Sequence, residues 1–385
     1  MMIQVLKPYY RTEEILELIR ECCDTSWTGI GGKMLDFEEA WKDYSGAKTC
    51  HMLNSATSGL QLAVKQLKDK YNWEDGDKIL TTSLTFVSTN HAILYNNLVP
   101  VFADIDHYGC LSLQGIKEAL KDNPEIKAVV FVGLGGNVGH LELIKKELKG
   151  TDVKIILDAA HMAGTKWKKT NKQVGCDEEG IDVTIFSGQA VKNLPTSDSG
   201  WICWNGDDAE EMDKMTRELS WLGINKDTFA RSSSQGSYKW YYDVPNLGFK
   251  FHANAISGCF GLVGLKYLDK DNAYRRNLSD LYSEKLDHPK IKIVPHNPEC
   301  VSSRHLFQIL VDKRDEIMLA LSQHGIYCGV HYRDNTTYSM YSQSKDKLSS
   351  ALGFSDNTIS LPLHLHLTEK EVSFICEKLI EIVNK

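Results

Sequence analysis

The stretch KIILDAAHMAG at residues 154–164 decides the fold class of this protein. Three apolar residues lie directly before Asp158, and a run of small residues follows it. This pattern is typical of a central strand in a parallel sheet, whose carboxyl end is the edge at which such sheets bind ligands. The stretch therefore predicts a carboxylate at a ligand-binding edge. The simpler interpretation is that Asp158 is the N-cap of a following helix.

The first two-thirds of the chain repeat this arrangement. Short apolar runs alternate with amphipathic helical patterns such as TSGLQLAVKQL (57–67) and LQGIKEALKD (113–122). The other expected strands are HMLN (51–54), DKILTTS (77–83), PVFADID (100–106), KAVVFVGLGG (127–136), VTIFSG (183–188) and GWICWN (200–205). Alternating strands and helices indicate βα units, so we expect an α/β fold with a mainly parallel central sheet.

The pattern changes after about residue 250. The expected elements there are a long helix (253–285), strands at SRHLFQILV (303–311), GIYCGVHY (325–332) and TISLPL (358–363), and a terminal helix (368–385). We therefore expect a large domain over residues 1–245, whose N-terminal segment can also pack on a smaller α+β domain over residues 246–385. The boundary is expected in DVPNLGF (243–249), and the aromatic stretch SYKWYYD (237–243) is expected to pack in a core or an interface.

The amino-acid composition argues against some classes of function. The 44 Lys and Arg residues against 51 Asp and Glu give a net charge of −7, which argues against a general nucleic-acid-binding protein. The ten cysteines lack CxxC spacing and lie mostly in apolar segments, which indicates free thiols in a reducing compartment. Neither a signal peptide nor a membrane span is recognisable in the sequence. The histidine pair in HLH (364–366) would need further side-chain ligands to bind a metal, and the sequence pattern offers none. We expect a cytoplasmic protein without a metal site.

Two glycine- or serine-rich loops are candidates for anion binding. NSATSGLQLA (54–63) runs from an expected strand into an expected helix. The first N–H groups and the dipole of such a helix attract anions. A simple N-cap by Ser55 or Thr57 explains the same sequence pattern equally well. GLGGNVG (133–139) resembles a dinucleotide-binding loop, but Val138 stands where the third glycine is needed. We expect a tight turn there instead.

The stretch FSGQAVKNLPTSDSGW (186–201) contains one lysine, Lys192, among small and uncharged residues. A lysine in a dry pocket can lose its proton and form a Schiff base with a carbonyl group, whereas an ordinary lysine lies on a solvated face. Pyridoxal phosphate needs such a lysine, an anion site, a carboxylate for its ring nitrogen and a flat apolar side chain over the ring. The chain supplies these groups in successive βα loops, as Lys192, Thr57 and Ser58 with Ser187, Asp158, and Phe86.

At these residues the sequence resembles the DegT/DnrJ/EryC1/StrS family of pyridoxal-phosphate-dependent nucleotide-sugar aminotransferases. The resemblance covers nearly the whole chain and rests on the number and order of its motifs. They are KMLDFEEAWKDYSGAKT (33–49), NSATSGLQLAV (54–64), LTFVSTNHAILYNNLVPVFADID (84–106), ILDAAHMAG (156–164), FSGQAVKNLPTSDSGW (186–201), LGFKFHANAI (247–256), SSRHLFQILV (302–311) and SLPLHLHLTEKEV (360–372). The resemblance implies a fold-type I aminotransferase that acts as a homodimer with shared active sites.

Roles follow from the resemblance position by position. Lys192 would form the Schiff base with the cofactor, and Asp158 would pair with its ring nitrogen. His161 would lie near the ring hydroxyl, and Phe86 would stack on the ring. The phosphate would be held by Thr57, Ser58 and Ser187. Residues near the substrate would be Gln189, His331 and Tyr332.

The chain departs from its relatives at four positions. Lys250 replaces an asparagine that in many members reaches the phosphate from the partner subunit, and a cation would serve the same phosphate. Gly188 and Gln189 replace a common Phe-His pair, which changes the expected substrate pocket. Ala255 stands where an acidic residue is frequent.

The resemblance predicts that L-glutamate passes its amino group to pyridoxal phosphate and that the resulting pyridoxamine phosphate aminates a nucleotide-linked keto-sugar, most simply a 4-keto-6-deoxyhexose. Three alternatives stay open: a transaminase of a non-sugar ketone such as a cyclitol, a pyridoxal-phosphate-dependent sugar dehydratase, and a non-catalytic regulatory relative. Some relatives carry histidine in place of the lysine and act as dehydratases, so the retained Lys192 favours transamination.

Overall fold

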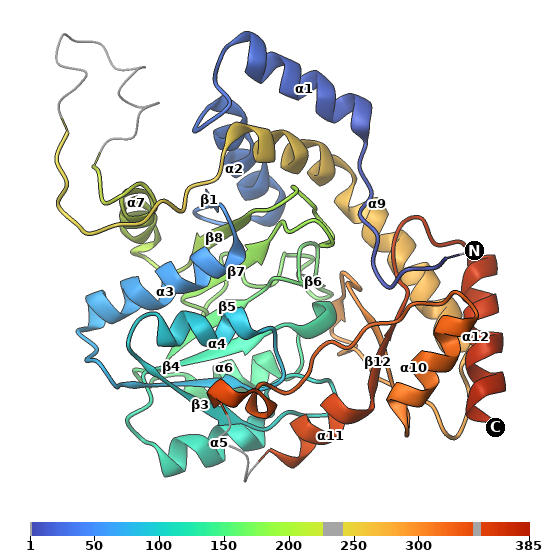
Figure 1. Ribbon diagram of the computed structural model, residues 1–385. Coiled ribbons are helices and arrows are strands. Elements are labelled where there is room, and N and C mark those ends of the chain that lie inside the picture. Colours follow the sequence, from blue (N-terminus) through green and yellow to red (C-terminus); the bar gives the residue numbers. More distant parts are fainter. Residues whose placement is uncertain (1, 226–241, 342–347) are drawn as a thin grey trace.

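The computed structural model describes residues 2–225, 242–341 and 348–385 (Figure 1). A large sheet with helices on both faces fills one side of the molecule, and smaller sheets and helices from the last third of the chain fill the other. Most of the aromatic stretch 237–243 lies outside the described residues, so its packing stays a prediction. In the part of the chain that the structure describes, no helix is long and apolar enough to span a membrane.

The large sheet has seven strands. Their order is β1 (His51–Leu53), β8 (Gly200–Trp204), β7 (Val183–Ser187), β5 (Lys154–Asp158), β4 (Ala128–Val132), β2 (Lys78–Thr82) and β3 (Val99–Ala103). The pairs from β7 to β3 are all parallel, and β8 is antiparallel to both of its neighbours. The predicted α/β class with a mainly parallel sheet is therefore confirmed.

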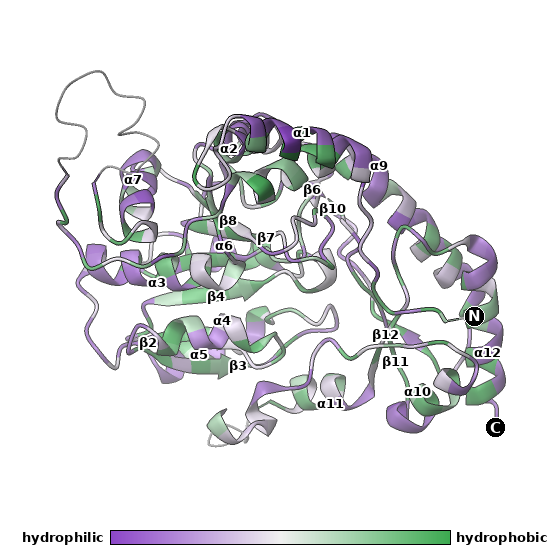
Figure 2. Cartoon of the chain, turned by 45° about the horizontal axis from the view of Figure 1, so that its top comes forward, coloured by the Kyte–Doolittle hydropathy of each residue, from purple (hydrophilic) through white to green (hydrophobic). Residues whose placement is uncertain are grey.

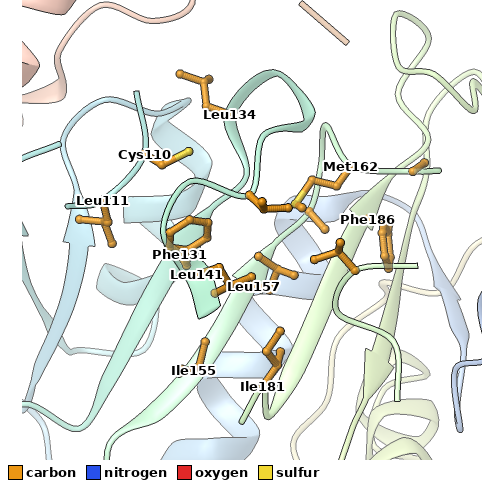
Figure 3. Packing of buried hydrophobic residues seen from close by; sticks show 14 of the residues in the cluster. Cys110, Leu111, Phe131, Leu134, Leu141, Ile155, Leu157, Met162, Ile181 and Phe186 are labelled. Atoms are coloured by element: carbon orange, nitrogen blue, oxygen red, sulfur yellow. The ribbon is translucent and has the colours of Figure 1, made fainter. Parts of the chain in front are cut away.

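Alternation along the central strands divides the core into two layers. Ile155 and Leu157 of β5 pack on one face with Phe131, as Figure 3 shows, whereas Ile156 packs on the opposite face with Val130. The first face is covered by α2 (Gly32–Ser45), α5 (Leu113–Asp122) and α6 (Leu141–Leu148). The second face is covered by α3 (Ala56–Tyr71), α4 (Val87–Leu94) and α7 (Ala209–Ser220). Strands buried on both faces need apolar side chains in both directions, which explains their continuous apolar runs.

The last third of the chain builds a second core around a three-stranded antiparallel sheet of order β12-β11-β9. Its elements are β9 (Lys292–Ile293), β11 (Phe307–Leu310), α10 (Arg314–Gln323), the short helix η2 (Asn335–Thr337), α11 (Ser349–Asn357), β12 (Thr358–Leu361) and α12 (Glu369–Val383). β10 (Cys300–Val301) leaves this region and pairs with β6 (Lys166–Trp167) of the first part of the chain. Figure 2 shows the outer helices carrying hydrophilic residues on their exposed sides.

Helix α9 (Ala255–Lys285) links the two regions. Its first half packs on α2 and on α1 (Thr12–Asp24), and its second half contributes Leu278 and Tyr282 to the second core. The N-terminal segment reaches the same core, because Ile3 pairs with Ile326. We keep the domain boundary near residue 245 as a proposal.

The expected strand at residues 325–332 is wrong. Tyr327 N–H donates to the Ile3 carbonyl, whereas Gly329 exchanges both backbone hydrogen bonds with Ser360. The segment changes partners within two residues, so it forms isolated bridges in place of a continuous ladder. Apolar content alone cannot reveal such a change of partner.

Candidate functional site

A cavity of about 430 Å³ opens at the carboxyl ends of β5 and β7, beside the N-terminus of α3. Its volume is within the range of small-molecule sites. Of the residues predicted from the sequence, the cavity is lined by Thr57, Phe86, Asp158, His161, Ser187, Gln189, Lys192, His331 and Tyr332. The chain segments that carry these residues are far apart in sequence: the sheet brings those that follow its strands to one edge, and His331 and Tyr332 reach the cavity from the last third of the chain.

Lys192 lies in the loop after β7, with its side chain partly buried in the cavity. Burial lowers the pKa of its amino group to about 8, although the negative charge of Asp158 partly opposes this shift. About one lysine in ten is then neutral at pH 7, compared with fewer than one in a thousand for an ordinary lysine. The neutral amine is the form that attacks a carbonyl carbon.

Asp158 ends strand β5, and its carboxylate is held on both oxygens. The Thr89 hydroxyl donates to Oδ2 at 2.7 Å, and the Ala160 N–H donates to Oδ1 at 3.1 Å. Burial raises the pKa of Asp158, while these two hydrogen bonds and Lys192 lower it. Thr89 belongs to α4, and sequence reasoning missed it because nothing local marks it as a partner of a residue 69 positions away.

His161 is fixed in one tautomer. The Gly135 N–H donates to its Nδ1 at 3.1 Å, so in the neutral ring the proton is on Nε2, which then donates to the Tyr332 hydroxyl at 3.1 Å. Burial, with the positive charge of Lys192 second, lowers the pKa of His161 well below its ordinary value, which keeps the ring neutral. The predicted turn at 133–139 is confirmed: it forms a short helix, η1 (Leu134–Gly136), and supplies this N–H.

The N-terminus of α3 supplies the anion site. Ser55 caps the helix by accepting the Ser58 N–H at 3.1 Å, which leaves the N–H groups of Ala56 and Thr57 without acceptors among the described residues. Gly200 of β8 packs so closely that a Cβ there would lie 2.4 Å from the Ala56 nitrogen. Ser58 itself is not in the cavity lining, because its hydroxyl donates to Asn54 Oδ1 at 2.6 Å. Its predicted contact with a phosphate stays a prediction.

Phe86 precedes α4 and leaves 58% of its surface exposed. Large aromatic side chains usually bury their rings, so this exposure at a cavity wall indicates a surface for a planar ligand. The Phe86 ring lies 6.0 Å from that of Tyr332, centroid to centroid. A flat group bound in the cavity would extend this aromatic contact.

The departures from the family pattern have structural correlates. A Cβ at Gly188 would lie 2.5 Å from the Thr196 hydroxyl oxygen, so the loop before Lys192 has no room for a larger residue. Ala255 is fully buried beneath α1 and α2, where an acidic side chain would have to be buried too. Lys250 does not line the cavity of its own chain; its amino group lies 3.2 Å from the centroid of the Trp221 ring. Its predicted contact with a phosphate in the partner subunit stays a prediction.

These groups fit pyridoxal phosphate. The N–H groups at the start of α3 and the hydroxyls of Thr57 and Ser187 suit its phosphate. The buried carboxylate of Asp158, which has no salt bridge among the described residues, suits its ring nitrogen. The perturbed amino group of Lys192 suits its aldehyde. In the described ranges no cluster of three or more possible metal ligands occurs.

Comparisons with known proteins agree with this site. The model of the DegT/DnrJ/EryC1/StrS aminotransferase family matches residues 10–380. The chain is 30% identical over 388 residues to the spore coat polysaccharide biosynthesis protein SpsC of Bacillus subtilis, covering 98% of this chain and 96% of that protein. It is also 30% identical over 370 residues to the UDP-4-amino-4,6-dideoxy-N-acetyl-beta-L-altrosamine transaminase of Campylobacter jejuni, covering 92% and 91%.

A solved structure gives the same result for the fold and the cofactor. The putative sugar aminotransferase Spr1654 from Streptococcus pneumoniae, in its pyridoxamine phosphate form, superimposes with a TM-score of 0.87 at 26% identity, covering 99% of both chains. The same protein is also known in its pyridoxal phosphate form. The chain therefore belongs to the DegT/DnrJ/EryC1/StrS aminotransferase family of pyridoxal-phosphate-dependent sugar aminotransferases.

Proposed function

We propose that this enzyme transfers the amino group of L-glutamate to a nucleotide-linked keto-sugar, an NDP-4-keto-6-deoxyhexose. The observation that carries the proposal is the position of Lys192, whose lowered pKa and proximity to Asp158 suit amino transfer in a cavity of about 430 Å³. The name of the Campylobacter relative specifies a UDP-linked amino sugar of the 4,6-dideoxy type. That name supports a nucleotide-linked 6-deoxy sugar as the substrate class here.

The bound cofactor supplies an electron sink for the substrate carbon. Asp158, whose carboxylate is held by the Thr89 hydroxyl, would pair with the ring nitrogen of the cofactor. Once its amino group is free, Lys192 accepts a proton at Nζ and returns it to a neighbouring carbon. The Nε2–H of His161, which donates to the Tyr332 hydroxyl in this cavity, would turn to an oxygen on the ring edge of the cofactor, since the Gly135 N–H occupies the other ring nitrogen.

We further propose that two copies of the chain form a homodimer in the cytoplasm. Phe86 and the exposed Gln189 lie at the open side of the cavity, where a second chain can approach. Lys250 is directed at Trp221 in its own chain and is proposed to serve the phosphate of the partner's site. Sedimentation equilibrium with and without the cofactor tests the assembly.

The direct test is a transamination assay with the purified enzyme. Incubation with pyridoxal phosphate, ¹⁵N-labelled L-glutamate and a dTDP- or UDP-4-keto-6-deoxyhexose is expected to give the ¹⁵N-labelled amino sugar nucleotide and an equal amount of 2-oxoglutarate by mass spectrometry. Keto-cyclitols in parallel reactions test the alternative transaminase. A product that has lost water without gaining nitrogen would identify a dehydratase. No nitrogen transfer from any donor would contradict the proposal.

A further inference from the structure

Two threonine hydroxyls form a chain of hydrogen bonds from the cavity wall to Asp158. Thr85 lines the cavity and is 2% exposed, and Thr89 lies four residues later, in the first turn of α4. The two hydroxyl oxygens are 3.0 Å apart, and that of Thr89 is 2.7 Å from Asp158 Oδ2. All three side chains are buried, where water competes little for such hydrogen bonds.

The number of available protons fixes the direction of this chain. A hydroxyl group carries one proton, whereas an ionised carboxylate can only accept. The Thr89 proton is used on Asp158, so the Thr89 oxygen must accept the hydrogen bond that joins it to the Thr85 hydroxyl. Aligned hydrogen bonds polarise one another, so the bond from Thr85 strengthens the bond from Thr89 to the carboxylate.

Asn335, from the last third of the chain, holds Thr85 in place. Its side-chain amide donates to the Thr85 carbonyl at 2.7 Å, and since a backbone carbonyl can only accept, the NH₂ group must face it. Its Oδ1 atom accepts from the Asn90 amide at 3.0 Å, which agrees with this orientation. Its backbone N–H donates to the Ser83 carbonyl at 2.8 Å. One fully buried asparagine therefore fixes the backbone on both sides of the cavity-lining threonine.

The same contacts keep Thr89 from an alternative hydrogen bond. A threonine in a helix can donate to the carbonyl four residues earlier, which for Thr89 is the carbonyl of Thr85. The Asn335 amide already donates to that carbonyl, and the Thr85 hydroxyl donates to the Thr89 oxygen. Both contacts favour the rotamer in which Thr89 donates to Asp158.

This segment also forms part of the cavity wall. Thr85 and Thr89 flank Phe86, whose exposed ring lines the cavity. We propose that Thr85 is a positioning residue that directs the Thr89 hydroxyl at Asp158 and thereby holds the carboxylate ionised for the ring nitrogen of the cofactor. The inference rests on the proposed function, in which Asp158 pairs with that nitrogen. Thr85 acts through Thr89 and needs no contact of its own with the ring.

Asp158 needs this support because its burial opposes its charge. Burial raises its pKa, and the hydrogen bonds from Thr89 and the Ala160 N–H, together with the charge of Lys192, offset this rise only in part. Tyr332 is a further titratable group close to the carboxylate, and burial, with the charge of Asp158 second, raises the pKa of its phenol, which stays neutral. A weaker bond from Thr89 therefore raises the pKa of Asp158 further.

Threonine-to-valine substitutions test this chain of hydrogen bonds, because valine keeps the shape of the side chain and replaces the hydroxyl by a methyl group. The cofactor-free enzyme is labelled with ¹³C at its aspartate side-chain carboxyl groups, and the signal that Asp158→Asn removes is followed against pH. We expect the titration midpoint to rise in Thr85→Val and to rise further in Thr89→Val. Thr85→Ser keeps a hydroxyl and should retain the wild-type midpoint. Thr81→Val, which removes a similarly buried hydroxyl that donates to Asn90, should leave the midpoint unchanged.

The double variant shows whether Thr85 acts through Thr89. If it does, adding Thr85→Val to Thr89→Val causes no further rise in the midpoint, because the connection to Asp158 is already broken. An unchanged midpoint in Thr85→Val would overturn the inference. An equal rise in both backgrounds would also overturn it, because Thr85 would then affect the carboxylate by another route.

A second measurement separates this inference from the role of Asp158 itself. In enzyme loaded with pyridoxal phosphate that carries ¹⁵N in its ring, the ¹⁵N chemical shift reports how far the ring nitrogen is protonated. If Asp158→Asn leaves this shift at the wild-type value, the proposed pairing of Asp158 with the ring nitrogen is wrong. We expect Thr85→Val to move the shift part of the way toward that of Asp158→Asn, and Thr85→Ser to retain the wild-type value. A wild-type shift in Thr85→Val, when that of Asp158→Asn differs, would overturn the inference alone.

Discussion

Replacing Thr89 by valine removes one hydroxyl from the site and keeps the shape of the side chain. That hydroxyl donates to Asp158 Oδ2 at 2.7 Å in a buried setting. A hydrogen bond to a charged group contributes about 1.5–3 kcal/mol, and its loss raises the pKa of Asp158 because the ionised carboxylate is no longer stabilised by the hydroxyl. Burial already raises that pKa, so the substitution moves the carboxyl group further toward its neutral form.

Because a neutral Asp158 no longer stabilises a protonated ring nitrogen, we expect Thr89→Val to lower kcat/KM for amino transfer at pH 7 by about tenfold or more. The loss should shrink as the pH is raised, since the carboxyl group then ionises again. Thr81→Val is the matched control: Thr81 is equally buried, but its hydroxyl donates to Asn90 Oδ1 and not to Asp158. Equal losses in both variants, or a pH-independent loss in Thr89→Val, would refute the reasoning.

Three further outcomes are expected. Lys192 must be neutral to act as a base, so the rate of the step that it catalyses should rise with pH and level off above about pH 8. The Lys192→Arg variant keeps its side chain charged and should therefore be inactive at every pH. Burial lowers the pKa of His331 to about 4, below its value in the unfolded chain, so on acidification the unfolded chain binds this proton first. The contribution of neutral His331 to stability is therefore present above about pH 6.5 and is lost toward pH 4, by at most about 1.4 kcal/mol per pH unit. The free energy of unfolding measured with urea should accordingly depend less on pH in this range for His331→Gln than for the wild type. Gly188→Ala should reduce the free energy of unfolding by about 1–3 kcal/mol, because its Cβ would lie 2.5 Å from the Thr196 hydroxyl oxygen, and an unchanged unfolding midpoint would show that the loop has room for it.

The sequence alone was enough to predict the site residues that directly follow strands. Asp158 and Ser187 end neighbouring parallel strands, so their meeting at one sheet edge follows from strand order, and Lys192 comes five residues later on a short loop. The start of α3 belongs to the same set, because β1 ends three residues before it. The order of strands and helices, which local sequence patterns predict, therefore explains why these residues meet in one cavity.

Residues that act through a partner distant in sequence were missed. Thr89 contacts Asp158 across 69 residues, and Asn335 contacts Thr85 across 250. Neither has a local pattern that differs from an ordinary core threonine or asparagine, since the effect depends on which atom of the partner faces it. The contact of Ser58 with a phosphate stays a prediction, and in this structure its hydroxyl donates to Asn54 Oδ1.

The central claim is that Lys192 is the residue to which pyridoxal phosphate becomes attached. Borohydride reduction of the enzyme with bound cofactor makes this attachment permanent, and peptide mapping by mass spectrometry then locates it. The account predicts one modified site, at Lys192 within residues 186–201, and none in that peptide when Lys192 is replaced by alanine. Stoichiometric attachment at any other lysine, or an unmodified peptide 186–201 in active enzyme, would contradict it.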